Sequence, residues 1–311
     1  MRIVVVGSAN IDLVATAPHL PRAGETVLGQ SFTQVPGGKG ANQAIAACRA
    51  GASVGFIAAI GSDAFGVTLR ARLTASTVDT SLLRVVYGTS GVALIVVDAA
   101  GENAIVVAPG ANAALTSLTE PDLAAIAGAD VVVLQLEIPI GTVTSAAVAA
   151  RAAGVRVLLN AAPARTLPDE LVAAVDLLVV NQVEGAALAG VSPVGVDAVP
   201  DPGDVDPWTV VEALLDRFPR VVLTRGAAGA WYGTREADPV HVPAPVIEAV
   251  DSTAAGDAFT AALAVGWGEG RELIDAVRWA SAAGAAAAQR LGASSALPPR
   301  KDIDELYSLT Y

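Results

Sequence analysis

The chain contains 311 residues, of which 53% are hydrophobic and 16% are charged, and it carries a formal net charge of -12 at pH 7. This length permits two domains or one large α/β domain with an insertion, and the hydrophobic content is sufficient for a sizeable core. The acidic charge argues against nucleic acid as a partner, because neutralising a phosphate backbone requires a basic surface.

Residue types with reactive side chains are scarce. Cys48 is the only cysteine, which rules out an intrachain disulfide and a cysteine-based zinc site. The two histidines, His19 and His241, lie far apart in sequence, which disfavours a Ser-His-Asp hydrolase and a histidine-rich metal centre. No run of 18 or more large apolar residues occurs, and the N-terminal apolar run is too short for a signal peptide, so we expect no membrane partner and a cytoplasmic protein.

The first predicted strand is Ile3–Val6, a continuous β-branched run typical of a strand buried on both faces of a parallel sheet. A glycine follows it at Gly7. The G-x-G-x-x-G spacing of dinucleotide-binding proteins is absent, however, and this disfavours an NAD-dependent dehydrogenase.

Alternating polarity between Glu25 and Val35 predicts a strand with one wet face. A similar pair is predicted at Val92–Asp98 and Ala104–Ala108, joined by residues of hairpin-turn composition. These segments predict a small antiparallel β lid inserted in two places, at 12–35 and 89–112. The α/β core then comprises 1–11, 36–88 and 113–311.

The segment from Pro36 to Gln43 holds three glycines in four positions and leads into an amphipathic helix. Small residues there allow the backbone to approach a ligand, and Lys39 and Asn42 add polar groups. Gly40 follows Lys39 where a Walker A loop has Ser or Thr, so this is not a P-loop. Ligand binding and a merely flexible turn remain equal interpretations of this segment alone.

From Asp130 onward, apolar runs of strand length alternate with helical patterns, which predicts a parallel sheet covered by helices on both faces. The predicted strands are Val131–Leu136, Val155–Leu159, Leu177–Val180 and Val221–Thr224. The predicted helices are Thr142–Ala153, Glu170–Val175, Glu184–Leu188 and Trp208–Phe218, with a Pro/Asp-rich surface loop at Ser192–Pro207 and a packed helix at Ala280–Ala288.

Polar residues stand at or just beyond the carboxyl ends of these strands, at Glu137, Asn160, Asn181 and Thr224. Because such ends meet at one edge of a doubly wound sheet, the four residues predict a single ligand pocket. Each of them taken singly fits a turn former or a helix cap equally well.

Two of these positions predict nucleotide contacts. Asn181 and Glu184 place an amide and a carboxylate three residues apart at a helix start, where they can hold a hydrated magnesium ion. Glu184 can also be only a favourable first-turn acid. The Gly-containing turn Thr224–Gly229 suits close passage of a nucleotide phosphate.

The segment Asp251–Phe259 leads into a helix predicted from about Ala255 to Gly266. The amides of a first helical turn form an anion site, and Asp257 lies in that turn as a carboxylate able to accept a proton. Together these groups predict phosphoryl transfer to a hydroxyl. The alternative is that Asp257 only complements the helix dipole and Gly256 only eases packing.

The chain resembles the ribokinase family of carbohydrate kinases over essentially its whole length. The resemblance rests on two signature motifs, Gly37–Gln43 and Asp251–Asp257, and on four segments similar to ribokinases in particular, namely Gly7–Asp12, Gly24–Val27, Pro109–Asn112 and Leu134–Pro139. It implies a doubly wound α/β domain with a small β lid that often forms a dimer interface.

The resemblance also implies roles for individual residues. Substrate-binding residues would be Asn10, Asp12, Gly38, Lys39, Gly40, Asn42 and Glu137, with Asp257 as the base and the amides of Ala254, Ala255 and Gly256 stabilising the transferring phosphoryl group. ATP and magnesium would contact Asn181, Glu184, Thr224, Gly226, Gly229, Gly256 and Ser281.

Ribokinases are also activated by a monovalent cation, usually potassium. The matching ligand positions are Asp251, Thr253, Ala287, Arg290, Gly292 and Ala296. Ala296 departs from the serine common in the family, although Ser295 is adjacent. Ala161 and Gln182-Val183 also depart from the pattern, but they leave Asn160, Asn181 and Glu184 in place.

The expected reaction is in-line transfer of the ATP γ-phosphoryl group to a pentose hydroxyl, with O5 of D-ribose favoured. Nucleoside, fructose and ketodeoxy sugar-acid kinases of the same fold are the alternatives, as is a catalytically silent sugar-binding protein. A nucleoside requires an aromatic or apolar wall for stacking, and Phe32 is the only aromatic residue in the first lid segment, which favours a free sugar.

Overall fold

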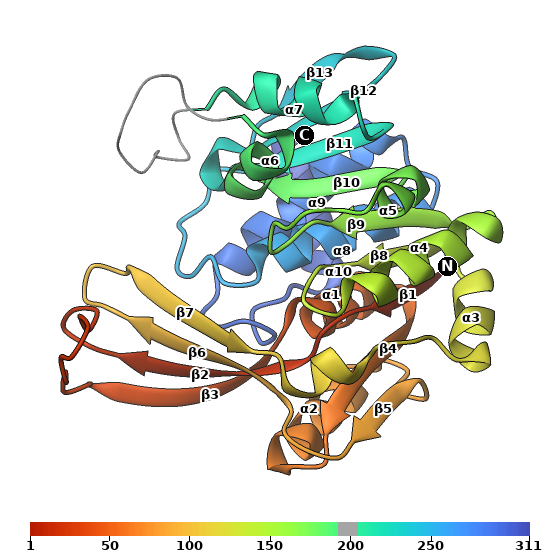
Figure 1. Ribbon diagram of the computed structural model, residues 1–311. Helices are drawn as coiled ribbons and strands as arrows, with labels where there is room; N and C mark the ends of the chain where they lie inside the picture. The colour runs from red at the N-terminus through yellow and green to blue at the C-terminus, as the bar shows by residue number, and fades with distance from the viewer. Residues whose placement is uncertain (192–204) are drawn as a thin grey trace.

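A large, mainly parallel sheet forms the centre of the computed structural model, which describes residues 1–191 and 205–311. Within these residues its strand order is β13-β12-β11-β10-β9-β8-β1-β4-β5, and Figure 1 shows its strands stacked from top to bottom. Every pair of neighbouring strands from β11 along this order to β5 is parallel. The pairs β11–β12 and β12–β13 are antiparallel. The bounds are β1 Arg2–Val6, β4 Ser53–Gly61, β5 Leu83–Val86, β8 Val131–Leu134, β9 Arg156–Asn160, β10 Leu177–Asn181, β11 Arg220–Thr224, β12 Ala230–Thr234 and β13 Ala237–Val242.

Helices cover both faces of this sheet, as predicted (Figure 1). On one face lie α1 Lys39–Arg49, α2 Ala64–Ala75, α8 Ala255–Gly268, α9 Leu273–Ala288 and α10 Arg300–Thr310. On the other lie α3 Glu120–Ala127, α4 Ile140–Ala152, α5 Asp169–Ala174, α6 Gln182–Ala189 and α7 Pro207–Leu215.

The continuous apolar runs of the strands divide between two cores. Ile3 and Val5 of β1 belong to the core under α1 and α8, whereas Val4 and Val6 belong to the core under α4. This follows from the two-residue period of a strand, which places successive side chains on opposite faces. A strand with helices on both sides therefore needs apolar residues at every position.

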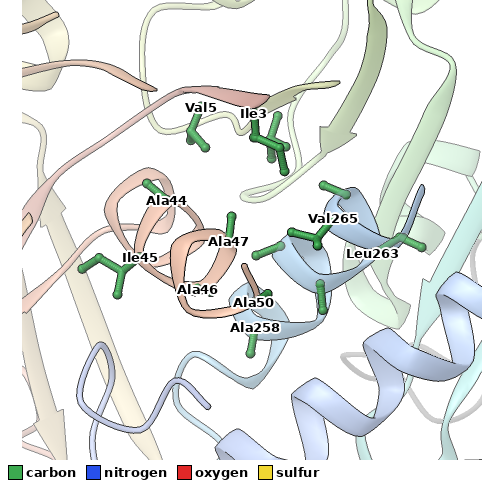
Figure 2. Packing of buried hydrophobic residues seen from close by; sticks show 14 of the residues in the cluster. Ile3, Val5, Ala44, Ile45, Ala46, Ala47, Ala50, Ala258, Leu263 and Val265 are labelled. Atoms are coloured by element: carbon green, nitrogen blue, oxygen red, sulfur yellow. The ribbon is translucent and has the colours of Figure 1, made fainter. Parts of the chain in front are cut away.

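Alanine allows two helices to lie close together beneath β1. Ala44 and Ala47 of α1 and the residue after the helix, Ala50, belong to the same cluster as Ala258 and Leu263 of α8, and the two helices lie side by side (Figure 2). Small side chains permit a short distance between helix axes, so the two helix starts that carry the signature motifs are packed against each other.

A second sheet of four strands projects away from the large one at the lower left of Figure 1. Its order is β3-β2-β6-β7, with bounds β2 Asn10–Thr16, β3 Ser31–Gly37, β6 Gly91–Val97 and β7 Asn103–Ala108. The two outer pairings are antiparallel as predicted, but β2 and β6 at its centre pair in parallel. Both central strands leave the core in the same direction, which the alternation of polarity does not reveal.

Several predicted boundaries differ from the structure. The strand predicted from Glu25 begins only at Ser31, and β8 ends at Leu134 rather than at Leu136, whose N–H bonds instead to Ala162 O. Most of the predicted loop Ser192–Pro207 lies outside the described residues. Within the described residues, no helix has both the length and the apolar character that a bilayer crossing requires.

Candidate active site

The carboxyl ends of adjacent parallel strands bring the predicted polar residues to one edge of the sheet. Asn160 ends β9, Asn181 ends β10 and Thr224 ends β11, and these three strands are neighbours. Glu137 lies three residues beyond β8, the strand that flanks β9 on the side opposite β10. These four positions therefore lie at one edge of the sheet.

Asp257 lies in the first turn of α8 and is buried beside the first turns of α1. Asn42 Nδ2 donates to Asp257 Oδ2 at 2.9 Å, and Gln43 Nε2 donates to Asp257 Oδ1 at 3.0 Å. Burial raises the pKa of Asp257 above its ordinary value, although Lys39 and the two amide donors oppose that change. A buried carboxylate with a raised pKa is suited to accept a proton.

Asn42 also offers an acceptor beside this carboxylate. Its Oδ1 atom is buried and has no hydrogen-bond partner among the described residues. An unpaired buried carbonyl is costly, and a hydroxyl group of a ligand would satisfy it. The pair of Asn42 Oδ1 and Asp257 therefore fits a polyhydroxylated molecule.

Glu137 connects three segments of the site. Ser8 Oγ and the backbone N–H of Lys39 donate to its Oε2 atom at 2.5 and 3.1 Å, and the N–H of Gly40 donates to Ser8 Oγ at 3.3 Å. Only Oε2 receives these bonds, and Oε1 has no hydrogen-bond partner among the described residues. The carboxylate is fixed relative to the start of α1.

Lys39 lies among four carboxylates without an ion pair to any described residue within 4.0 Å. Burial lowers its pKa, but the combined charges of Asp257, Glu137, Glu184 and Asp12 raise that pKa above the ordinary value. The ammonium group therefore stays charged and offsets part of the negative charge at this edge of the sheet.

Asp12 reaches the same site from β2 of the small sheet. Burial, followed by the charges of Glu137 and Asp257, raises the pKa of Asp12 to about 7, against a lowering effect of Lys39. A Cβ atom at Gly37 would lie 2.1 Å from Asp12 Oδ2, so glycine at that position makes room for the carboxylate. Asp12 therefore lies in the small sheet, near enough to Glu137 and Asp257 for their charges to act on it.

Replacement of Asp12 by asparagine is expected to stabilise the fold at high pH. The carboxyl pKa is 3.8 in the unfolded chain and about 7 in the folded one, so ionisation weakens folding progressively between these values. The loss of folding free energy caused by ionisation is complete above the pKa of the folded state and absent below the pKa of the unfolded state. Its upper bound is about 4 kcal/mol, reduced by solvent access to the partly exposed group.

Urea unfolding of wild type and Asp12→Asn at about pH 8 and about pH 4 measures this difference. We expect the variant to be more stable than wild type at the higher pH, and the two to converge at the lower pH. Equal stability at the higher pH would contradict the electrostatic environment described for Asp12.

Asn10 also lies at the site, at the start of β2, and is buried. Its Oδ1 atom accepts from Asn112 Nδ2 at 2.7 Å, and Asn112 Oδ1 accepts from the Ala9 N–H at 3.0 Å. A Cβ atom at Gly91 would lie 2.2 Å from both side-chain amides. Asn112 therefore positions Asn10, a role that the sequence analysis did not assign.

The first turn of α8 has the geometry expected of an anion site. Ala254 adopts φ 61°, an uncommon left-handed conformation for alanine, and caps the helix without a side-chain hydrogen bond. The N–H of Ala255 is used within the turn, donating to Ser252 O at 3.1 Å. Of the three predicted amides, those of Ala254 and Gly256 have no acceptor among the described residues.

Gly256 distinguishes the two interpretations of this turn. A Cβ atom there would meet no atom within 4 Å, and the residue does not have a positive φ. Neither packing nor backbone conformation therefore requires glycine at 256. Open space above the helix start fits a ligand that approaches the backbone closely.

Gly38 and Gly40 have a structural explanation instead. Gly38 has φ 90°, and a Cβ atom there would lie 2.7 Å from Asn10 N. A Cβ atom at Gly40 would lie 2.5 Å from Ser8 N. These glycines allow the start of α1 to pack against the segment that follows β1, which places Lys39 and Asn42 at the site.

Asn181 and Glu184 form a reciprocal capping box at the start of α6. The Glu184 N–H donates to Asn181 Oδ1 at 2.8 Å, and the Asn181 N–H donates to Glu184 Oε2 at 3.1 Å. Burial raises the pKa of Glu184, and the bond from Asn181 and the charge of Lys39 counteract this. Glu184 Oε1 has no hydrogen-bond partner among the described residues.

The other predicted nucleotide contacts lie on separate elements. Thr224 Oγ1 bonds to Val180 O at 3.4 Å, and residues Gly226–Ala228 form a single 3-10 turn. Gly226 and Gly229 have φ 50° and 90°, which explains both glycines conformationally. Ser281 is buried in α9 and bonds to Val277 O at 3.0 Å.

The predicted potassium ligands come together in part. Asp251 Oδ1 accepts from Thr253 N and Oγ1 at 2.9 and 2.6 Å, and Asp251 Oδ2 accepts from Gly292 N at 2.9 Å. Although burial raises the pKa of Asp251, these donors hold it below its ordinary value. The Asp251 carboxylate thus connects residues 251–253 to residues 287–292 through hydrogen bonds.

Ala296 supplies no hydroxyl group to this region, and Ser295 does not replace it. Ser295 is exposed, and its Oγ atom bonds to Leu291 O at 3.4 Å. Arg72 and Arg49 donate to the carbonyl groups of Ser294 and Ser295. Any cation here would depend on Asp251 and on the remaining backbone carbonyls.

One cavity lies away from this site. It has a volume of about 760 Å³ and lies between α2 and β5, lined by residues such as Asp63, Val67 and Arg70. It contains none of the predicted site residues. We assign the site from the converging carboxylates and the open helix start, which carry the chemistry.

Comparison with known proteins agrees with these observations. Residues 1–300 match the family described as pfkB family carbohydrate kinase. The chain is 38% identical to a ribokinase of Bacillus subtilis over 310 residues, covering 98% of this chain and 99% of the relative. It is 35% identical to a ribokinase of Haemophilus influenzae over 305 residues, covering 97% of each.

A solved structure of Arabidopsis thaliana ribokinase, complexed with ribose and ATP, is also similar. It superimposes with a TM-score of 0.87 at 30% identity, covering 98% of each chain. The match thus extends over both sheets and over the segments that carry the site residues. This chain belongs to the pfkB family of carbohydrate kinases.

Proposed function

We propose that this protein is a ribokinase, which transfers the γ-phosphoryl group of ATP to O5 of D-ribose. One observation carries the proposal: Asp257 is buried at the start of α8, held by Asn42 and Gln43, beside an exposed glycine that packing does not require. The names of its relatives, and the ribose and ATP bound to the Arabidopsis structure, support this substrate pair.

In the proposed mechanism Asp257 accepts the proton of the sugar hydroxyl as the oxygen attacks the γ-phosphorus. A new O–P bond forms on the sugar, the bond to the bridging oxygen breaks, and ADP leaves with its electron pair. The Ala254 and Gly256 amides donate to the equatorial oxygens of the transferring group, where negative charge accumulates. Positioning and electrostatics supply most of the acceleration.

The sugar is proposed to lie between the two sheets. Asp12 and Asn10 bind its hydroxyl groups from the small sheet, and Glu137, Asn42 and the segment Gly38–Gly40 bind it from the core. All of these groups are acceptors or donors suited to hydroxyl recognition. The residues proposed to bind sugar thus come from the small sheet and from the core.

ATP is proposed to lie along Thr224, Gly226 and Gly229, with Ser281 near the adenine. Magnesium, when bound, neutralises charge on the β- and γ-phosphates. No group of three or more metal-ligating side chains occurs among the described residues. A hydrated ion held through water by Glu184 fits this donor set, because Mg²⁺ retains several waters.

Potassium is proposed as an activator, bound by Asp251 and Thr253 and by the 287–296 segment through Ala287, Arg290, Gly292 and Ala296. Support comes from the bond between Gly292 N and Asp251, which brings these segments together. The ion would stabilise the loop that precedes the α8 anion site. Its contribution is measured as the ratio of turnover in potassium to turnover in sodium.

The small sheet is proposed to act as a lid, formed by 12–35 and 89–112, over a core of 1–11, 36–88 and 113–311. Closure would exclude water that would otherwise hydrolyse ATP.

Every residue of β7 is exposed, including Ile105, Val106 and Val107. We propose that a second copy of the chain covers this apolar strand in a homodimer, which sedimentation analysis would detect.

The deciding experiment is a phosphorylation assay with ATP and magnesium, with and without potassium. The acceptors are D-ribose, fructose, a ketodeoxy sugar acid and a nucleoside. We expect D-ribose to have the highest kcat/KM, the product to carry phosphate on O5, and potassium to increase turnover. A higher kcat/KM for another acceptor would reassign the substrate, and equal rates in potassium and sodium would exclude potassium as an activator.

Because the proposed reaction uses ATP, we also propose that the enzyme works in the cytoplasm.

A further inference from the structure

Three buried side-chain amides form a chain that ends on Asp257. Gln135 Nε2 donates to Gln43 Oε1 at 2.6 Å, and Gln43 Nε2 donates to both Asp257 Oδ1 and Asn160 Oδ1 at 3.0 Å. Asn160 Nδ2 donates in turn to the backbone oxygen Val179 O at 3.3 Å. Gln135 and Gln43 are 0% and 1% exposed, which separates these bonds from water.

The chain has a single direction. Val179 O is a fixed backbone acceptor, so Asn160 turns its Nδ2 atom toward it and its Oδ1 atom toward Gln43. Rotation of the Gln43 amide by half a turn would place its oxygen against two acceptors, Asp257 Oδ1 and Asn160 Oδ1. It would also place its NH₂ group against the NH₂ group of Gln135. Both arrangements are repulsive, so the network selects one orientation of Gln43.

A glycine provides the space for Gln135. A Cβ atom at Gly7 would lie 1.9 Å from Gln135 Oε1, so no other residue at position 7 is compatible with this side-chain position. Gln135 Oε1 is itself buried without a partner among the described residues. An unpaired buried acceptor has a free-energy cost, whereas the other polar atom of this side chain, Nε2, makes the bond to Gln43.

We propose that Gln43 is a positioning residue for Asp257, and that Gln135 acts through Gln43 by bonding to its amide oxygen. This inference rests on the proposed base role of Asp257. Gln43 and Asn42 hold one carboxylate oxygen each, so the two donors together determine the plane of the carboxylate. Loss of Gln43 leaves that plane free to rotate away from the sugar hydroxyl.

The same bond affects the protonation of Asp257. Donation from Gln43 and Asn42 lowers the pKa of Asp257, in opposition to burial. The other charged groups that act on Asp257, or on which its charge acts, are Lys39 of α1, Glu137 beyond β8, Asp12 of β2 and Glu184 of α6. With these unchanged, removal of the Gln43 donor raises the Asp257 pKa, and a smaller fraction of the base is ionised at a given pH.

The test compares Gln43→Met, Gln135→Met and the double variant, since methionine has the length and flexibility of glutamine without its hydrogen bonds. We expect Gln43→Met to lower kcat about 10- to 100-fold with the Kd for ribose unchanged. We also expect the acid limb of the kcat pH profile to move to higher pH. Gln135→Met should also lower kcat and move the acid limb to higher pH, each by less than Gln43→Met does.

Non-additivity identifies the route of action. If Gln135 acts through Gln43, the double variant should be no slower than Gln43→Met alone. Gln182→Met is the matched control, because Gln182 is also buried and donates its Nε2 atom to a backbone oxygen, Val205 O. Its acid limb should coincide with that of wild type. Additive losses would overturn the role of Gln135, and an unmoved acid limb in Gln43→Met would overturn that of Gln43.

A second measurement does not depend on turnover. The unfolding free energies of wild type, Gln43→Met, Asp257→Leu and their double variant form a cycle whose coupling reports the Gln43–Asp257 bond. We expect a non-zero coupling, and additive free energies would contradict the contact. If wild type phosphorylates no acceptor while the coupling is present, then the proposed function fails and the contact stands.

Discussion

Asp257→Asn is expected to lower kcat by roughly 10²- to 10⁴-fold while the Kd for the sugar stays nearly unchanged. Asparagine has almost the shape of aspartate but cannot accept a proton from the substrate hydroxyl. Asn42 donates to one carboxylate oxygen and Gln43 to the other, so asparagine keeps an acceptor for one of these donors and loses the other bond. ATP consumption measures kcat, and calorimetric titration with sugar measures the Kd.

Asp122→Asn is the matched control for this prediction. Asp122 is also a buried carboxylate in the first turn of a helix, α3, where it pairs with Arg84 and completes a capping box with Thr119. Its replacement should lower stability and leave kcat close to wild type. Near-normal turnover in Asp257→Asn would remove Asp257 from the role of base.

Gly256→Val is expected to reduce kcat by about 10²- to 10³-fold without unfolding the protein. A Cβ atom at Gly256 meets nothing within 4 Å, so the fold can accommodate a side chain there. The branched side chain would occupy the space over the helix start and keep the phosphoryl group from the amides. Single-turnover kinetics measures the chemical step, and thermal unfolding measures stability.

Gly141→Val tests the specificity of that effect. Gly141 is likewise the second residue of a helix, α4, and a Cβ atom there also has no neighbour within 4 Å. Both variants place valine in a first helical turn at similar cost in helix propensity, but only Gly256 lies at the proposed phosphate site. Unimpaired catalysis in Gly256→Val would show that the α8 amides do not contact the transferring group.

The order of elements was accessible from the sequence because local signals determine it. Ile3–Val6 and Leu177–Val180 are continuous apolar runs, and both are strands of the parallel sheet. The capping of α6 was also foreseeable, since Asn181 and Glu184 have the spacing of a capping box. Only the structure showed that the cap uses one oxygen of Glu184, Oε2, and leaves the other oxygen without a partner among the described residues.

The interpretation of individual glycines required the structure. Gly40 and Gly256 belong to two similar-looking motifs, yet a side chain would collide with Ser8 at the first position and with nothing at the second. The parallel pairing of β2 with β6 could not be predicted from the sequence either, because the alternation of polarity indicates only which face of a strand is exposed to solvent. They do not report the direction of its neighbour.

The amino-acid sequence by itself determined the α/β architecture, the two helix starts that face the ligand edge, and Asp257 as the candidate base. These features depend on residues close together in the chain. Only the tertiary structure decided that Gln43, Gln135 and Asn160 join Asp257, since 92 to 214 residues separate the bonded pairs. Their meeting follows from the strand order, in which β1 lies between β4 and β8. Such an order results from packing helices on both faces of one sheet, which no local pattern specifies.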